Sequence, residues 1–156
     1  MSGLHDKGFF DLQTPADLLG KLGRELERMQ SAPRDIDHAF NFFVTAEHML
    51  DWLYPGKAND TKRSEARKLP LLALVSHIAN GSKHFMAEAK RHKSMTWTVE
   101  VHRHEVQLCI VVTFDTGLSY GSERMIRPVG DIARLVFEHW RGELSKGATA
   151  MASAPP

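Results

Sequence analysis

The chain has 156 residues, of which 42% are hydrophobic and 25% are charged. This length and balance are typical of one globular domain that buries a sizeable core without disulfides or a structural metal. The formal net charge of +1 excludes a strong overall field that would attract nucleic acid or a membrane surface. One cysteine, no signal-peptide pattern and no apolar run of membrane-spanning length predict a cytoplasmic protein with no membrane partner.

Residues 14–31 predict an amphipathic helix. Thr14 and Asp17 stand at the positions of a capping box, and Pro15 suits the first helical position. Leucines and a methionine then recur at spacings of three and four residues and form an apolar stripe. Charged residues, among them Lys21 and Glu25, fall on the other faces. The helix is therefore expected to pack on the surface of the domain and to end near residue 33.

Residues 35–54 are apolar on nearly every face, which predicts a helix buried between neighbouring elements and ended by Pro55-Gly56. The charged residues 57–68 predict a loop or a solvated first turn. Residues 69–79 predict a further helix, and Asn80-Gly81 predicts a left-handed stop or a kink. Residues 82–91 are expected to continue as a short helix.

The hydrophobic period changes near residue 97, where strict alternation predicts a half-buried strand. Residues 106–115 predict its antiparallel partner, and residues 118–126 a weak third strand. Pro128 is expected to start the last helix, with a stripe formed by Ile132, Leu135, Val136, His139, Trp140 and Leu144. The predicted fold class is α+β: a helical bundle core of three to four helices with a small antiparallel β-sheet before the C-terminal helix. Residues 9–146 are predicted to form the single domain, and residues 147–156 a disordered tail.

The buried second helix carries the first candidate site. Glu47 and Asp51 are four residues apart and share a face, and His48 adjoins Asp51 at a spacing of three. Isolated charges in a dry interior are costly, so these groups need a partner or water. One interpretation is a carboxylate–imidazole binding site between helices. The other is that this face looks into a groove, or that the acids pair with a lysine or arginine from elsewhere in the chain.

The stretch Asn80–His84 forms the second candidate site. His84 is a candidate general acid or base, while Lys83 or Asn80 would bind an anionic oxygen. Gly81 would let backbone amides approach a phosphate, and Ser82 belongs to the same binding group. The alternative is an ordinary helix end, where Lys83 and His84 complement the helix dipole.

Histidine spacing gives only a weak metal prediction. His102 and His104 alternate onto one strand face with Glu100, a pattern that can share a metal but is more often an exposed polar face. A three-histidine set on the helices would have to come from His38, His48, His77 and His84. His38 and His48 are about 15 Å apart along one helix, so one ion cannot take both. No metal or cofactor is predicted, and Cys109 is expected to be a small buried hydrophobic residue.

The segments GFFDLQTPADLL, FNFFVTAEHMLDWLYPG and LVSHIANGSKHF together resemble a family of uncharacterised bacterial proteins, small and cytoplasmic. The likeness covers most of the chain, from residue 9 through the final helix. It implies one domain and brings no established activity.

A more distant resemblance is to HEPN domains. These are helical bundles, often ribonucleases of toxin–antitoxin and antiphage systems, with an Arg, then usually Asn, Asp or His, then a His on a helix at a dimer interface. Asn80 and His84 match the later part of that signature, whereas Ala79 stands at the Arg position. The resemblance implies a metal-independent homodimer that binds or cleaves RNA or a nucleotide. His84 would be its acid or base and Lys83 its phosphate contact, although Lys83 lacks the planar fork of arginine.

Two further expectations accompany this interpretation. The Asn80–His84 corner and the Glu47–Asp51 helix are expected to face one polar pocket. A basic patch for RNA could form from Arg63, Arg67, Lys68, Lys83, Lys90, Arg91 and Lys93. The alternative function is a non-catalytic protein–protein interaction or regulatory domain that keeps the scaffold without the arginine. A third is a metal-dependent helical-bundle enzyme.

Overall fold

The computed structural model describes residues 10–83, 99–104, 109–115 and 124–152. Within these ranges the α-helices are α1 (Pro15–Ser31), α2 (Ile36–Leu53), α3 (Asp60–Ala66), α4 (Pro70–Lys83) and α6 (Val129–Ala152). A short 3₁₀ helix, η1 (Lys57–Asn59), precedes α3. The strands are β1 (Val99–His104), β2 (Cys109–Asp115) and β3 (Arg124–Pro128). The predicted helical core is confirmed.

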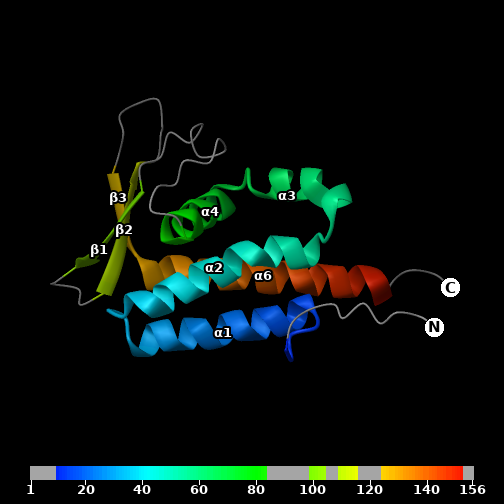
Figure 1. The fold of residues 1–156 in the computed structure, drawn as a ribbon, viewed down its shortest axis with the longest axis horizontal. Helices are drawn as coiled ribbons and strands as arrows, with labels where there is room; N and C mark the ends of the chain where they lie inside the picture. Colours follow the sequence, from blue (N-terminus) through cyan, green and yellow to red (C-terminus); the bar gives the residue numbers. More distant parts are fainter. Residues whose placement is uncertain (1–9, 84–98, 105–108, 116–123, 153–156) are drawn as a thin grey trace.

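The helix α2 lies at the centre of the bundle and contacts α1, α4 and α6. Figure 1 shows that α1 and α4 run toward the strands, whereas α2 and α6 start beside them and run away. The C-terminal ends of α1 and α4 and the N-terminal ends of α2 and α6 therefore lie at the same end of the bundle. This arrangement brings the Asn80–Lys83 segment and the connection from α1 to α2 to one end of the molecule.

The predicted capping box starts α1. The Thr14 hydroxyl accepts a hydrogen bond from the Asp17 N–H at 3.2 Å, and the Asp17 carboxylate accepts the Thr14 N–H at 2.8 Å. These reciprocal bonds satisfy backbone donors that have no partner in the first turn of a helix. The helix ends at Ser31, close to the predicted position.

The core forms around α2, as predicted for a helix that is apolar on nearly every face. Phe42 and Phe43 are fully buried and meet edge to face, with ring centroids 5.3 Å apart. From α6, Ile132, Val136 and Trp140 enter the same core. Leu135, predicted in that stripe, is 61% exposed. It lies about 100° around the helix axis from Val136, which turns it toward solvent.

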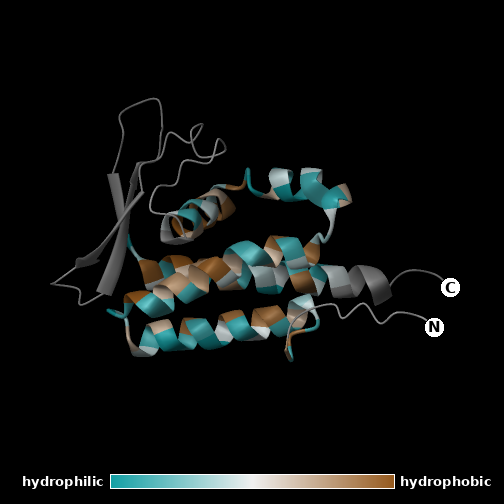
Figure 2. Ribbon diagram, in the orientation of Figure 1, coloured by the Kyte–Doolittle hydropathy of each residue, from teal (hydrophilic) through white to brown (hydrophobic). Residues whose placement is uncertain are grey.

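The segment predicted as a loop or solvated turn, residues 57–68, contains η1 and α3. None of the side chains of α3 is buried, and Figure 2 shows this helix as mainly hydrophilic. The chain enters the segment through Gly56, whose φ of +78° is unfavourable for residues with a side chain. The charge of the segment therefore predicted its solvation but not its helical backbone.

The predicted stop at Asn80-Gly81 is wrong, because α4 continues to Lys83. Gly81 does not adopt the left-handed conformation that a helix stop requires. The Asn80 side chain donates to the Ser76 carbonyl at 2.7 Å, one turn earlier, and this bond is made within a continuing helix. The rest of the predicted short helix 82–91, from residue 84 onward, lies outside the described residues.

The three strands pair antiparallel in the order β1–β2–β3. Val101 of β1 faces Val112 of β2, which in turn faces Arg127 of β3. Pro128 ends β3, and α6 starts at the next residue; the prediction that Pro128 begins the helix is therefore displaced by one position.

The final helix is longer than predicted. Its backbone runs to Ala152, so residues 147–152 are helical although the sequence predicts a disordered tail from residue 147. Three alanines in this stretch, Ala148, Ala150 and Ala152, explain the difference, because alanine has the highest helix propensity. None of the helices in the described ranges is long and apolar enough to cross a membrane.

Candidate functional site

A buried chain of polar side chains joins α2 to α4. Glu47 is 5% exposed, and its Oε1 accepts from Arg67 Nε at 2.9 Å and from the Ser76 hydroxyl at 3.2 Å. Asn80, also buried, donates from Nδ2 to the Ser76 carbonyl and lies 3.5 Å from the Ser76 hydroxyl. The two predicted site residues Glu47 and Asn80 are therefore connected, through a serine, inside the bundle.

His48 and Asp51, in contrast, lie at the surface. Their side chains are about half exposed, with His48 Nδ1 3.1 Å from Asp51 Oδ2. Arg63 Nε approaches the same carboxylate at 3.7 Å. Successive helix residues are rotated by about 100°, so His48 leaves the face that Glu47 occupies. The expectation that Glu47, His48 and Asp51 share one polar pocket with Asn80 is wrong for His48 and Asp51.

The end of α4 carries the remaining predicted residues. Gly81 is exposed, and nothing lies within 4 Å of the position where a Cβ would stand. Because its N–H belongs to a continuous helix, we correct the expectation that Gly81 opens the backbone to a phosphate. Ser82 and Lys83 have helical backbones, while their side chains and all of His84 lie outside the described part of the structure.

Sequence reasoning missed Ser76 and the particular arginine. It left open that the acids pair with a cation from elsewhere, and Arg67 is that cation for Glu47. Ser76 lies in the apolar run that predicts α4, four residues before Asn80. The available signal in the sequence was a serine one helical turn before Asn80 within a largely apolar run.

A second buried carboxylate lies on the opposite flank of α2. Glu25 of α1, placed on a polar face by the sequence, is buried and forms an ion pair with Lys21. Lys21 Nζ also donates to the Thr45 hydroxyl at 2.7 Å, and that hydroxyl lies 3.4 Å from Glu25 Oε2. Lys21 neutralises Glu25 within α1, and both side chains contact Thr45 of α2. The cluster therefore links α1 to α2.

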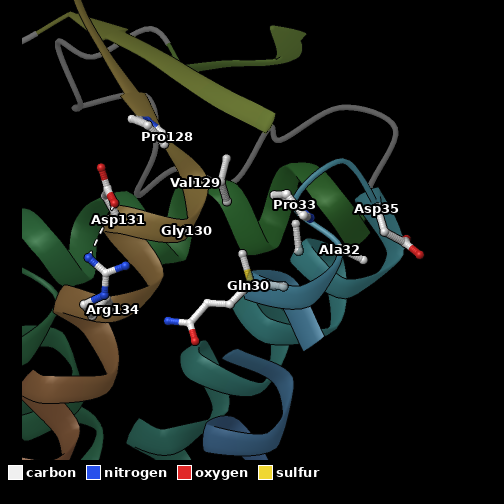
Figure 3. Close-up of a pocket in the computed structure, with 11 residues that line it drawn as sticks. Gln30, Ala32, Pro33, Asp35, Pro128, Val129, Gly130, Asp131 and Arg134 are labelled. Carbon is white, nitrogen blue, oxygen red and sulfur yellow. Dashed lines mark ion pairs between the residues drawn. The ribbon is translucent and has the colours of Figure 1, made fainter. Parts of the chain in front are cut away.

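A pocket of about 360 Å³ lies between the end of α1, the start of α2 and the start of α6. Met29, Ala39 and Val129 contribute apolar surface. Figure 3 shows Gln30 on one side and the Asp131–Arg134 ion pair, 3.6 Å long, on the facing side. Its volume is in the range of small-ligand sites. No sequence pattern indicates this pocket, because its residues come from three separate segments.

Two histidines have lowered pKa values. Burial lowers the pKa of His77 on α4, because the charged imidazolium loses hydration there. Burial also lowers the pKa of His139 on α6. Two smaller contributions act on the same ring: the charge of Glu143 raises its pKa, and the charge of Lys146 lowers it. Both rings therefore favour the neutral form.

The metal interpretations gain no support from the described part of the chain, in which no three His, Cys, Asp or Glu side chains are grouped to hold an ion. The side chains of Glu100, His102, His104 and Cys109 fall outside that part.

The three members of the predicted basic patch whose side chains are described are all paired with carboxylates. Arg67 pairs with Glu47, Arg63 with Asp51 and Asp60, and Lys68 with Glu65. Each positive charge is therefore offset by a nearby carboxylate. The side chain of Lys83 and the residues Lys90, Arg91 and Lys93 lie outside the described part.

The fold and site define a helical bundle whose central helix is held on two flanks by buried, internally neutralised glutamates. Comparison with family models, curated proteins and solved structures finds no match to this chain.

Proposed function

We propose that the protein is a HEPN-like domain that binds or cleaves RNA or a nucleotide at the C-terminal end of α4. The observation that carries this proposal is the continuity of α4 through Asn80, Gly81, Ser82 and Lys83. A signature of the Asn-x-x-x-His type belongs on a helix, and an uninterrupted helix places residues 80 and 83 on neighbouring positions of one face.

In this proposal His84 is the acid or base and Lys83 the phosphate contact. Asn80 positions the helix end, because its amide is buried and bound to Ser76 rather than directed to solvent. Glu47 supports that position through Ser76. Ala79 at the expected arginine position removes a second cationic group, so Lys83 and His84 act without the planar fork that an arginine would offer.

A cleavage assay tests the proposal. Purified protein is incubated with end-labelled RNA beside His84→Ala and a control, His38→Ala, whose ring lies at the start of α2 next to Asp35. Wild type and His38→Ala are expected to cleave equally, with and without chelator, and His84→Ala to lose about 100-fold or more. Equal products from wild type and His84→Ala would remove His84 as catalyst, and chelator-sensitive cleavage would favour the metal-dependent alternative.

RNA binding without cleavage is measured by fluorescence anisotropy. Lys83→Gln is expected to weaken binding several-fold, whereas Lys57→Gln, on the exposed η1, leaves it unchanged. Intact RNA together with the absence of binding would reject both forms of the proposal.

A second candidate function is non-catalytic association, either with another copy or with a partner in a defence or regulatory context. Two large apolar side chains one turn apart on α2 favour it: Ile36 is 49% exposed and Phe40 is 40% exposed. They flank Ala39, which lines the pocket at the start of α6. Self-association through this face predicts a dimer in sedimentation velocity that Phe40→Lys dissociates. The Leu135→Lys variant, altered at an exposed leucine of α6 as the control, should remain dimeric.

A further inference from the structure

Residues 57–69 connect α2 to α4 and contain η1 and α3. We call this segment the strap. Ala66 is its one hydrophobic residue packed against the core, and the side chains of Arg63 and Arg67 are only 13% and 21% exposed. Figure 1 shows the strap at the end of α2 that lies away from the strands. Apart from the stems of these two arginines, apolar burial therefore contributes little to holding it in place.

Two arginines and two carboxylates connect the strap to α2. Arg67 Nε lies 2.9 Å from Glu47 Oε1, and Arg63 Nε lies 3.7 Å from Asp51 Oδ1. The arginines are four residues apart, as are the carboxylates, and they pair in opposite chain order. The strap is therefore aligned antiparallel to the last turns of α2 by a double ion pair.

The two ion pairs differ in environment. The Asp51 side chain is 49% exposed, so its pairing with Arg63 is weakened by water and salt. Glu47 is buried, and removal of Arg67 leaves its charge without a cation. Arg63 also donates to the backbone carbonyls of Tyr54 and Gly56, which fastens the entry to the strap.

Both ends of the strap favour movement as a unit. Gly56 supplies a turn with φ of +78° before η1. At the other end Pro70 starts α4, and its ring nitrogen cannot donate a hydrogen bond back into the strap. The strap is thus separated from α2 and α4 by residues that interrupt regular backbone structure.

We propose that the strap is a hinged cover that opens from α2 while the helical bundle stays folded. Opening separates Arg67 from Glu47 and Arg63 from Asp51, and it admits water to the Glu47–Ser76–Asn80 chain. That chain fixes the last turns of α4, so the state of the strap regulates the end of α4. Opening of the strap does not require the protein to bind or cleave RNA.

Residue-resolved amide hydrogen exchange tests the opening. The amides of Arg67 and Lys68, which donate within the strap, are compared with those of Phe42 and Phe43 in α2. In the wild type the strap amides are expected to exchange about 100-fold faster or more, and faster still when salt is raised from low to high concentration. Strap amides that exchange as slowly as those of α2 at both salt concentrations would overturn the proposal.

Two variants test whether the Arg67–Glu47 ion pair holds the strap against α2. Arg67→Gln is expected to speed strap exchange about 10-fold while α1 and α6 keep wild-type rates. Lys68→Gln is the matched control, because Lys68 pairs with Glu65 inside the strap and not with α2. Equal acceleration in the strap and in α1 would make Arg67 a part of the global fold and reject the hinge. If Arg67→Gln does not fold, Glu47→Gln gives the same comparison with a neutral hydrogen-bond acceptor in place.

Discussion

At the scale of single residues, Ser76 has a larger role than its size indicates. Its hydroxyl donates to Glu47, and its backbone carbonyl accepts from Asn80, so one small residue connects a buried carboxylate to a buried amide. Ser76→Ala removes a donor from Glu47 without adding a replacement. Glu47 keeps its ion pair with Arg67, but a hydrogen bond to a charged group contributes about 1.5–3 kcal/mol, and we expect the free energy of unfolding to fall by that amount.

Urea unfolding followed by circular dichroism measures this change. Ser64→Ala, at an exposed position of α3, is the matched control and should stay within about 0.5 kcal/mol of wild type. A Ser76→Ala variant as stable as the control would show that the hydroxyl contributes nothing to the buried chain.

The sequence could predict the need of Glu47 for a partner but not the partner itself. A carboxylate on a helix that is apolar on most faces requires compensation wherever the helix packs. Arg67 lies 20 residues further along, and its approach depends on the helical path of α3 and the turn at Gly56. Lys21 and Glu25 show the reverse case: their spacing of four was visible, but the burial of Glu25 beside Thr45 of α2 was not.

At the scale of elements, local signals and packing had different predictive power. The start of α1 was predictable because Thr14, Pro15 and Asp17 act on their own neighbours. The end of α4 was not, since Asn80-Gly81 has the composition of a stop. The Asn80 amide bonds to Ser76 one turn earlier, and the bundle buries its side chain. A bond within the helix and tertiary packing therefore together maintain a helix that local propensity would end.

The capping box gives a prediction at the same scale. Hydrogen bonds from the Thr14 hydroxyl and from the backbone N–H groups of Gln13 and Thr14 lower the pKa of Asp17. A lowered pKa means that this contribution to stability is present above the ordinary aspartate pKa, about 4, and is lost as pH falls through the folded value. Asp17→Asn should therefore be less stable than wild type near neutral pH, and the difference should shrink in acid.

Thermal unfolding at a series of pH values checks this expectation. Asp37→Asn is the control, because Asp37 is exposed in the first turn of α2 and does not accept from its own cap residue. A difference between wild type and Asp17→Asn that stays constant down to strong acid would contradict the capping role.

At the scale of the whole molecule, charged side chains are buried beside the apolar core. The two buried glutamates lie on two flanks of α2: Glu25 is on α1 and faces α2, and Glu47 is on α2 and faces α4. Each is neutralised within the chain. Hydrophobic periodicity predicts the helices that supply the core. The three-dimensional match between charges on different helices could not be predicted, because it depends on how those helices align.

The histidines connect pH to the stability of this bundle. Burial lowers the pKa values of His77 and His139, so the folded state binds fewer protons than the unfolded state just below the ordinary histidine pKa, about 6.5. Stability from these rings is complete above that pH and is lost as pH falls toward their folded pKa values. The free energy of unfolding should therefore be lower at about pH 5.5 than at about pH 7.5, a window above the range in which most carboxylates titrate.

Urea unfolding at the two pH values measures the effect in wild type, His77→Gln and His139→Gln. Each substitution removes one ring that must be protonated against burial, so each variant is expected to lose part of the pH dependence. Wild-type stability that is equal at both pH values, or variants that keep the full difference, would show that these rings do not govern the acid sensitivity of the bundle.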